Sequence, residues 1–211
     1  MNIIIPARKG SKGLPGKNRL LLMHTLSEIP AEYHKKVIVS TDDEFILQNI
    51  RKNYSQCQVH SRSKESASDT ASTKKCIEET VRDFSLAGNI IMLYLTYPNR
   101  KWETVMKAYS WFVDQNASSL LCKEPLKSHP YLCMLELPNN RGKQIVEHDL
   151  YRRQDYPKCF RLSHAIAIFK TDVIEDLNSN LYNEDTIYYE IRESLDVDTP
   201  EDFERLKRKR K

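Results

Sequence analysis

The beginning of the chain constrains the fold most, because a short apolar segment passes directly into a glycine-rich loop. Ile3, Ile4 and Ile5 are followed by PARKGSKGLPGKN, in which glycines stand at positions 10, 13 and 16. The apolar run is too short for a buried helix, and its β-branched residues favour a buried parallel strand. Glycine allows tight turns and positive φ. The sequence therefore predicts a strand that ends in a loop.

This loop is strongly basic. No Asp or Glu occurs between Met1 and Leu26, and the cations of the loop are Arg8, Lys9, Lys12 and Lys17. Backbone N–H groups and cations at the end of a strand suit a polyphosphate. The loop is not a Walker A motif, because five residues instead of four separate its outer glycines and Asn18 replaces the Mg²⁺-binding Ser or Thr. A basic surface loop is the alternative interpretation.

Buried strands and amphipathic helices alternate along the rest of the chain. Strands are predicted over residues 36–40, 89–95, 118–122, 165–169 and 186–191. Helices are predicted to begin near residues 41–44, 69–72, 102, 172 and 199. This alternation is typical of an α/β fold with one mainly parallel, doubly wound sheet. We expect a single domain over residues 1–211.

The α/β pattern is interrupted between residues 123 and 158. Four prolines break the chain there, and residues 131–137 read as a strand between turns. Such an isolated strand has little core of its own and must bury its apolar side against something. We therefore predict an inserted arm at about residues 126–159.

Composition excludes several classes of protein. No apolar stretch approaches the roughly 18 residues that cross a bilayer, and Met1 leads directly into the first strand, so we expect neither a membrane span nor a signal peptide but a cytoplasmic protein. The net charge of +4 is accounted for by the terminal KRKRK run, which is interpreted as a solvated tail, so no nucleic-acid partner is expected. An RNA-binding module is an alternative that rests on this tail alone. The five cysteines and six histidines lack metal-ligand spacing, so no zinc site is expected.

Two further polar clusters lie in the second half of the chain. Asp196 and Asp198 precede the closing helix, and in an extended segment their carboxylates would point to one side, where Mg²⁺ would fit. Capping of that helix is an alternative role for at least one of them. The other cluster, YRRQDYPKCFR over residues 151–161, holds three arginines. Arginine matches carboxylates, so an acidic substrate is implied, and a solvated basic rim is the alternative.

Five segments together resemble the cytidylyltransferases that activate acidic sugars, and most closely the CMP-N-acylneuraminate (CMP-sialic acid) synthetases. Between Ile3 and about Leu206 they occur in the family's order: IIPARKGSKGLPGKN, VSTDDE, ASDTAS, RRQDYPKCFR and SLDVDTPEDF. The resemblance implies a Rossmann-like, GT-A-like nucleotidyltransferase fold whose arm is a dimerisation arm that crosses to the partner in a homodimer. It also implies transfer of CMP from CTP to the anomeric hydroxyl of a nonulosonic acid, with release of pyrophosphate.

The resemblance further implies roles for individual residues. Catalytic positions that hold the CTP phosphates are Arg8, Lys12 and Lys17. Other nucleotide-binding positions are Ser11 at the phosphates, Asn18 at the ribose, and Arg62, Ala71 and Thr73 around cytosine. Sugar-binding positions are Tyr94, Arg153 and Arg161, the two arginines being partly donated by the partner subunit. The metal carboxylates, for Mg²⁺, are Asp196 and Asp198.

Two departures from the family pattern concern the acceptor sugar. Tyr94 stands where the family has a sugar-contacting glutamine, and Ser163 and His164 replace an Asn-Gly pair. A legionaminic, pseudaminic or 3-deoxy-octulosonic acid is therefore an alternative acceptor. A catalytically silent nucleotide-binding homologue is a further alternative, although retention of both the cations and the metal carboxylates argues against it.

Overall fold

A seven-stranded β-sheet lies at the centre of the computed structural model, which describes residues 1–10, 13–192 and 194–209. In spatial order its strands are β3 (Gln58–Ser61), β2 (Val37–Thr41), β1 (Asn2–Pro6), β4 (Asn89–Met92), β8 (Arg161–Lys170), β5 (Ser119–Glu124) and β9 (Ile187–Glu190). β8 is antiparallel to β4 and β5, whereas the other neighbouring strands are parallel. The predicted mainly parallel, doubly wound α/β sheet is confirmed.

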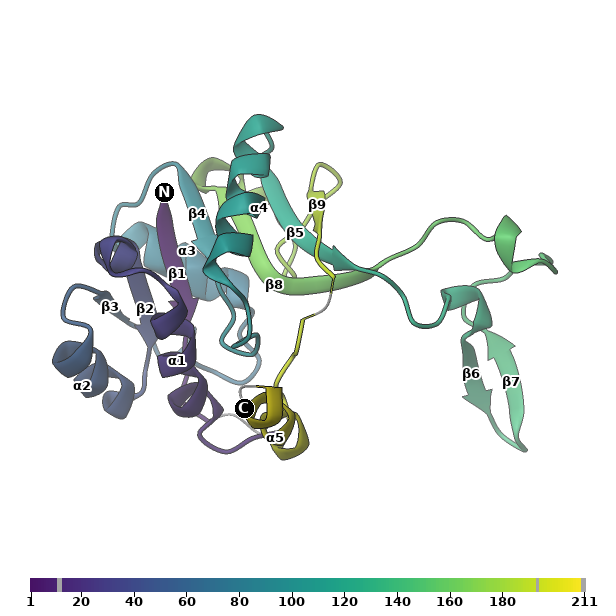
Figure 1. Ribbon diagram of the computed structural model, residues 1–211, viewed down its shortest axis with the longest axis horizontal. Helices are drawn as coiled ribbons and strands as arrows, with labels where there is room; N and C mark the ends of the chain where they lie inside the picture. Colours follow the sequence, from purple (N-terminus) through teal and green to yellow (C-terminus); the bar gives the residue numbers. More distant parts are fainter. Residues whose placement is uncertain (11–12, 193, 210–211) are drawn as a thin grey trace.

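Helices cover both faces of this sheet (Figure 1). Ile3 and Ile5 belong to one apolar layer, with α1 (Lys17–Glu28), α2 (Glu44–Asn53), α4 (Trp102–Asp114) and α5 (Pro200–Lys209). Ile4 belongs to the other layer, with α3 (Thr73–Asp83) and the 3₁₀-helix η4 (Thr171–Asp176). The layers alternate because successive residues of a strand point to opposite faces. The strand that opens the glycine loop is thus buried on both sides.

Polar caps begin the helices where the sequence predicts them. The Asp43 carboxylate caps α2 by accepting from the backbone N–H of Phe45 at 3.0 Å. The hydroxyl of Ser72 caps α3 by accepting from the N–H of Lys75 at 3.2 Å. Each cap satisfies a backbone donor that has no partner inside its helix.

Several elements differ from the sequence-based expectation. Residues 172–177 were expected to be α-helical, but η4 is a 3₁₀-helix. Only the second part of the strand expected at 131–137 is extended, as β6 (Met134–Leu137), because Pro130 starts the 3₁₀-helix η2 (Pro130–Leu132). The 3₁₀-helix η1 (Ala31–Lys36) and strand β3 were not predicted, and neither was α1 as a helix.

An arm leaves the body of the molecule between β5 and β8 and extends away from it (Figure 1). It contains η2, the antiparallel hairpin of β6 and β7 (Arg141–Gln144), and the 3₁₀-helix η3 (Arg153–Asp155). Asn139 and Asn140, in the loop between the two strands, both have positive φ, a conformation that asparagine adopts more readily than most residues.

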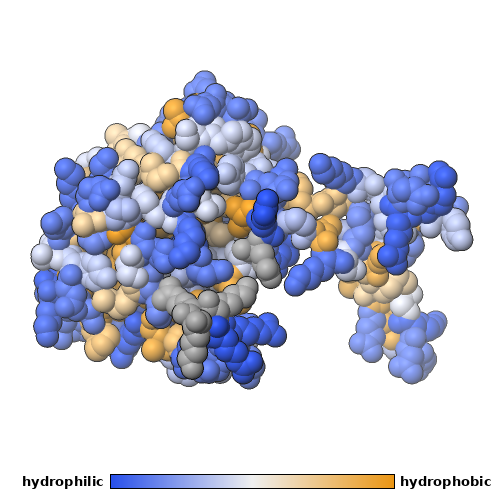
Figure 2. Space-filling view, in the orientation of Figure 1, coloured by the Kyte–Doolittle hydropathy of each residue, from blue (hydrophilic) through white to orange (hydrophobic). Residues whose placement is uncertain are grey.

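The arm exposes many apolar side chains, some of which form orange patches among the polar residues in Figure 2. They are Leu132, Met134, Leu135, Leu137, Ile145, Val146 and Leu150. A two-stranded hairpin is marginally stable by itself, so this surface calls for a covering partner.

All five cysteines are free thiols. None of the helices in the described part of the chain combines the length and the apolar character needed to cross a membrane.

Candidate functional site

The glycine loop after β1 packs against the segment that precedes α5. A Cβ atom at Gly13 would lie 2.6 Å from the carbonyl oxygen of Asp198, closer than real Cβ contacts, so glycine is required there. Lys17, the first residue of α1, places its ammonium 2.6 Å from Asp198 Oδ1. Segments from the two ends of the chain thus form one site.

A second set of contacts ties the loop to the region before α3. Asn18 Nδ2 donates to the carbonyl oxygen of Arg8 at 2.8 Å. The guanidinium of Arg8 lies 2.5 Å from Asp69 Oδ1. The two other predicted phosphate-binding residues, Ser11 and Lys12, lie outside the described residues.

A pocket of about 260 Å³ opens beside the loop. Seven residues in its wall are predicted site residues: Arg8, Lys17, Asn18, Arg62, Ala71, Thr73 and Tyr94. Lys17 and Thr73 are the first residues of α1 and α3, so two helix N-termini meet at this pocket. Helix N-termini and cations both favour bound anions. The pocket therefore suits a ligand with a phosphate chain.

Arg62 lines this pocket and is held there by a hydrogen bond within its own turn. Its Nη2 donates to the carbonyl oxygen of Ser66. Its Nε is buried and has no partner among the described residues. The hydrogen bond to Ser66 thus fixes the guanidinium in the pocket wall, where a charged donor group suits a ligand rich in acceptor atoms.

The two aspartates predicted to bind metal lie next to the pocket. The backbone N–H of Val197, between them, donates to the carbonyl oxygen of Thr96 at 2.7 Å, which fixes the segment beyond the end of β4. Asp196 Oδ2 accepts from the hydroxyl of Tyr97 at 3.0 Å. Burial raises the pKa of Asp196, and repulsion from the Asp198 carboxylate raises it further. The pair thus carries negative charge that a cation would relieve.

These aspartates are not the cap of α5. Asp202 and Thr199 form a capping box instead, in which the N–H of Asp202 donates to Thr199 Oγ1 at 3.2 Å and the N–H of Thr199 donates to Asp202 Oδ2 at 3.1 Å. Asp198 is largely exposed. Exposed carboxylate oxygens fit Mg²⁺, which takes oxygen ligands and keeps several waters.

A larger pocket of about 730 Å³ adjoins the aspartate segment. Its wall includes Asp196 and three arginines, Arg161, Arg192 and Arg205. Arg161 is ion-paired with Glu124, which also accepts from the hydroxyl of Ser194. Burial alone would raise the pKa of Glu124, but these hydrogen bonds and the arginine charge lower it overall. Glu124 is therefore ionised, and it holds Arg161 at the pocket.

Two predicted sugar-binding residues lie elsewhere. Tyr94 lines the smaller pocket beside Arg62, and its ring meets that of His164 edge to face at 5.7 Å between centroids. Arg153 is exposed in η3 on the arm and lines neither pocket within this chain. The structure therefore brings Arg161 and Asp196 together but leaves Arg153 apart.

Sequence reasoning missed Arg192 and Arg205, which line the larger pocket. Arg192 shortly precedes the aspartate segment, and Arg205 lies on α5 three residues after Asp202. Proximity to the aspartates was the available signal, but charged residues near a basic tail carry little information by themselves.

Comparison with known proteins relates the chain to nucleotidyl-transferring enzymes. A family model described as cytidylyltransferase matches residues 2–210. The chain is 28% identical to an N-acylneuraminate cytidylyltransferase of Streptococcus agalactiae, covering 95% of this chain and 51% of that protein. It therefore spans about half the length of that relative.

Two other proteins match over nearly their whole length. A CMP-N,N'-diacetyllegionaminic acid synthase of Legionella pneumophila is 28% identical, covering 95% of this chain and 91% of that protein. The solved structure of a CMP:2-keto-3-deoxy-manno-octonic acid synthetase complexed with CTP superposes with a TM-score of 0.69 at 18% identity. That match covers 99% of this chain and 97% of the other, and at this identity it supports the fold alone.

Proposed function

The chain belongs to the cytidylyltransferase family, whose model matches residues 2–210, and on this premise we propose that it transfers CMP from CTP to the anomeric hydroxyl of an acidic nonulosonic sugar. The observation that carries the proposal is the position of the aspartate pair between two pockets: Asp196 lines the larger pocket, and Asp198 contacts Lys17 of the smaller one. The smaller pocket is lined by Arg8, Lys17 and Arg62, and the larger one by three arginines.

CTP would occupy the smaller pocket. Its phosphates would lie against Arg8 and Lys17 at the N-terminus of α1, where the cations and the helix dipole offset negative charge. Its base would face Arg62, which lines this pocket. Asn18, already held by the carbonyl oxygen of Arg8, would face the ribose.

The acidic sugar would occupy the larger pocket. Arg161 and Arg192 can bind its carboxylate, since a guanidinium matches a carboxylate in shape and charge. The sugar's anomeric hydroxyl would then approach the α-phosphorus from this side. A bond forms between the sugar oxygen and the α-phosphorus while the bond from the α-phosphorus to the oxygen that bridges it to the β-phosphate breaks. Pyrophosphate leaves with the electron pair of that bond, and the hydroxyl proton is released.

Asp196 and Asp198 would hold Mg²⁺, which when bound offsets the charge of the phosphates. The donor set supports this assignment, because the carboxylates repel each other and Asp198 is exposed. Lys17 would bridge the two functions, since it lies in the nucleotide pocket and contacts Asp198.

We also propose that the active protein is a homodimer in which the arm crosses to the partner. The arm exposes apolar side chains that have no cover in this chain. Arg153, on the arm, would then reach the sugar pocket of the partner.

The acceptor is proposed only as a class. Relatives named for N-acylneuraminate and diacetyllegionaminic acid are both 28% identical over 95% of the chain, and one named for pseudaminic acid is 27% identical over 74% of it. Tyr94 and His164, which contact each other, depart from the N-acylneuraminate pattern. An acceptor other than N-acylneuraminate is therefore the second candidate.

A pyrophosphate-release assay tests the function directly. The protein is incubated with Mg²⁺, each of the four nucleoside triphosphates, and a panel of acidic and neutral sugars. Release that requires both CTP and an acidic nonulosonic sugar supports the proposal. Binding of CTP without release on any acidic sugar would favour a catalytically silent homologue, and release with neutral sugars alone would refute the acceptor class.

A further inference from the structure

A carboxylate outside both pockets organises the turn next to Arg62. Glu79, on α3, accepts from the backbone N–H of Ser63 at 3.1 Å through Oε1 and from the hydroxyl of Ser66 through Oε2. Burial by itself would raise the pKa of Glu79, but these hydrogen bonds lower it overall, so the side chain is ionised. One carboxylate thus holds two residues of the turn at once.

The same turn holds the guanidinium of Arg62. The carbonyl oxygen of Ser66, a fully buried residue, accepts from Arg62 Nη2. The turn is closed by a hydrogen bond of 3.1 Å from the N–H of Ser66 to Ser63 Oγ. The path from Glu79 through Ser66 to Arg62 is therefore continuous.

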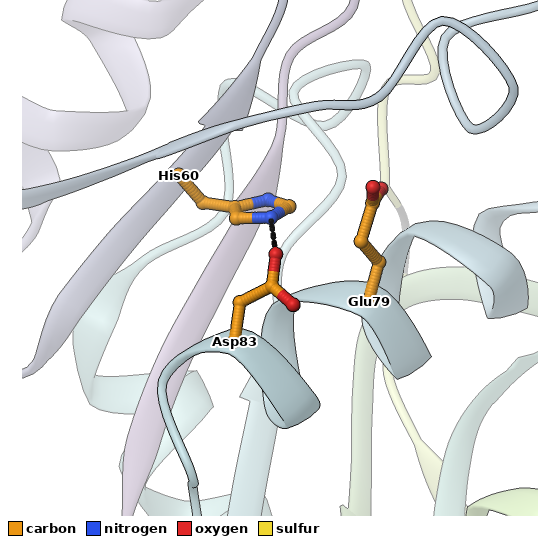
Figure 3. A group of neighbouring side chains, drawn as sticks. All are labelled: His60, Glu79 and Asp83. Carbon is orange, nitrogen blue, oxygen red and sulfur yellow. Dashed lines mark hydrogen bonds and ion pairs between the residues drawn. The ribbon is translucent and has the colours of Figure 1, made fainter.

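His60 fastens the other end of this segment. It is the β3 residue two positions before Arg62 and is 3% exposed. Its Nε2 donates to Asp83 Oδ2 at 3.1 Å, and its Nδ1 lies 2.8 Å from Ser40 Oγ. Figure 3 shows Asp83 reaching the ring from α3, with Glu79 rising from the preceding turn of that helix.

The side chains of His60, Glu79 and Asp83 have the donor types of a metal centre, and their ligand atoms lie within 4.8 Å of one another. However, both oxygens of Glu79 already accept hydrogen bonds from the turn, and the Nε2–H of His60 already pairs with Asp83. Binding a metal would break these contacts. The geometry therefore favours an anchoring role over a metal site.

We propose that Glu79 is a positioning residue for base recognition, which fixes the turn at residues 63–66 so that the guanidinium of Arg62 keeps its place in the wall of the smaller pocket. The inference rests on the proposed function, because it takes CTP as the ligand. Glu79 itself lines neither pocket. Its effect must pass through Arg62.

The test compares Glu79→Ala with the matched control Glu78→Ala. Glu78 lies beside Glu79 on α3, is partly exposed, and is paired only loosely with Lys74, at 3.7 Å. We expect Glu79→Ala to raise the Kd and KM for CTP about tenfold, because residues in one hydrogen-bond network are commonly coupled by energies of this order. The kcat at saturating CTP should change little. The control should keep wild-type values. Wild-type CTP affinity in folded Glu79→Ala would overturn the proposal.

A double-mutant cycle separates positioning from a general structural role. If Glu79 acts through Arg62, the variant carrying Arg62→Ala and Glu79→Ala should bind CTP no more weakly than Arg62→Ala alone. Additive losses would refute this. Glu79→Gln, which keeps one acceptor for the N–H of Ser63, should recover most of the affinity. Should Glu79→Ala not fold, the cycle is run with Glu79→Gln. Its smaller loss of CTP affinity must likewise disappear when Arg62→Ala is also present.

A readout without ligand distinguishes this inference from the proposed function. Hydrogen exchange at the backbone amides of Ser63 and Ser66 should be faster in Glu79→Ala and unchanged in Glu78→Ala. Equal exchange in all three proteins overturns the anchoring role whatever the ligand. If exchange responds but the wild-type protein binds no CTP, the proposed function fails and so does the role in base recognition.

Discussion

Lys17 Nζ lies 2.6 Å from Asp198 Oδ1, although one residue begins the first helix and the other precedes the last. The ammonium is mostly buried, with its side chain 14% exposed, whereas the carboxylate is 60% exposed. Lys17 is thus held in place by packing, while most of the Asp198 side chain faces solvent. The contact joins the end of the glycine loop to the proposed metal carboxylates before any ligand binds.

Asp198→Asn is expected to abolish turnover without unfolding the protein. Loss of an oriented charged group at a phosphoryl-transfer site commonly costs about 10²–10³ in rate. Steady-state kinetics and thermal melting measure the two effects. The control is Asp172→Asn, an exposed carboxylate on η4, which should keep wild-type kinetics. A folded Asp198→Asn enzyme with near-normal turnover would remove this residue from the proposed metal site.

CTP is expected to bind in preference to UTP, ATP and GTP. N3 of cytosine accepts a hydrogen bond whereas N3 of uracil donates one, so the guanidinium of Arg62, which can only donate, favours cytosine. Calorimetric titration with the four nucleotides in the presence of Mg²⁺ measures the preference. Arg62→Ala should weaken CTP more than UTP. Equal affinities for all four nucleotides would indicate a general phosphate site.

The arm is expected to make the protein a dimer with shared sugar sites. Light scattering should give twice the mass of the 24.8 kDa chain. Mixing Arg153→Ala with Asp198→Asn should restore part of the activity, since one hybrid site then carries both intact residues. Full activity of a monomer, or no recovery in verified mixed dimers, contradicts the shared site.

Acid is expected to weaken the fold partly through Asp43. Burial would raise the pKa of Asp43, but the hydrogen bonds from Arg19 and from the N–H of Phe45 lower it overall. Since the folded-state pKa lies below the unfolded value of about 3.9, Asp43 stabilises the fold above that pH, and this contribution disappears as the pH falls through the folded-state value.

Urea denaturation at several pH values measures this effect. Asp43→Asn keeps a cap but loses the ion pair with Arg19, which spans 2.7 Å. Its stability deficit should be clear at pH 7 and should shrink towards pH 3. A deficit that stays constant with pH would mean that the carboxylate charge contributes nothing.

The central strands could be predicted from sequence because burial on both faces leaves a continuous apolar signature, as in β1 and β4. β3 gave no such signal. It lies at the edge of the sheet, where Gln58 and Ser61 are exposed, Val59 is partly buried, and the one buried residue is the polar His60. The arm was predicted from its prolines, but β7 is exposed and polar and was missed.

The candidate site was predictable to the extent that its residues occur in contiguous segments. The glycine loop with its cations and the aspartate pair each form such a segment, and the structure brings Lys17 and Asp198 together. The anchoring of Arg62 by Glu79 could not be found in this way. It depends on a helix passing behind a turn, and a single glutamate on an amphipathic helix resembles any solvated residue.

The position at which the arm leaves the sheet determines how freely the length of the arm can vary. The last residue of β5, Glu124, pairs in register with the first residue of β8, Arg161, so the excursion begins and ends at neighbouring positions of one antiparallel ladder. Insertions or deletions between them leave the register of the seven-stranded sheet untouched. Arm length, and with it the proposed subunit association, can therefore diverge without disturbing the sheet that carries the smaller pocket, and a short turn in place of residues 125–160 should yield a separate α/β body that lacks Arg153.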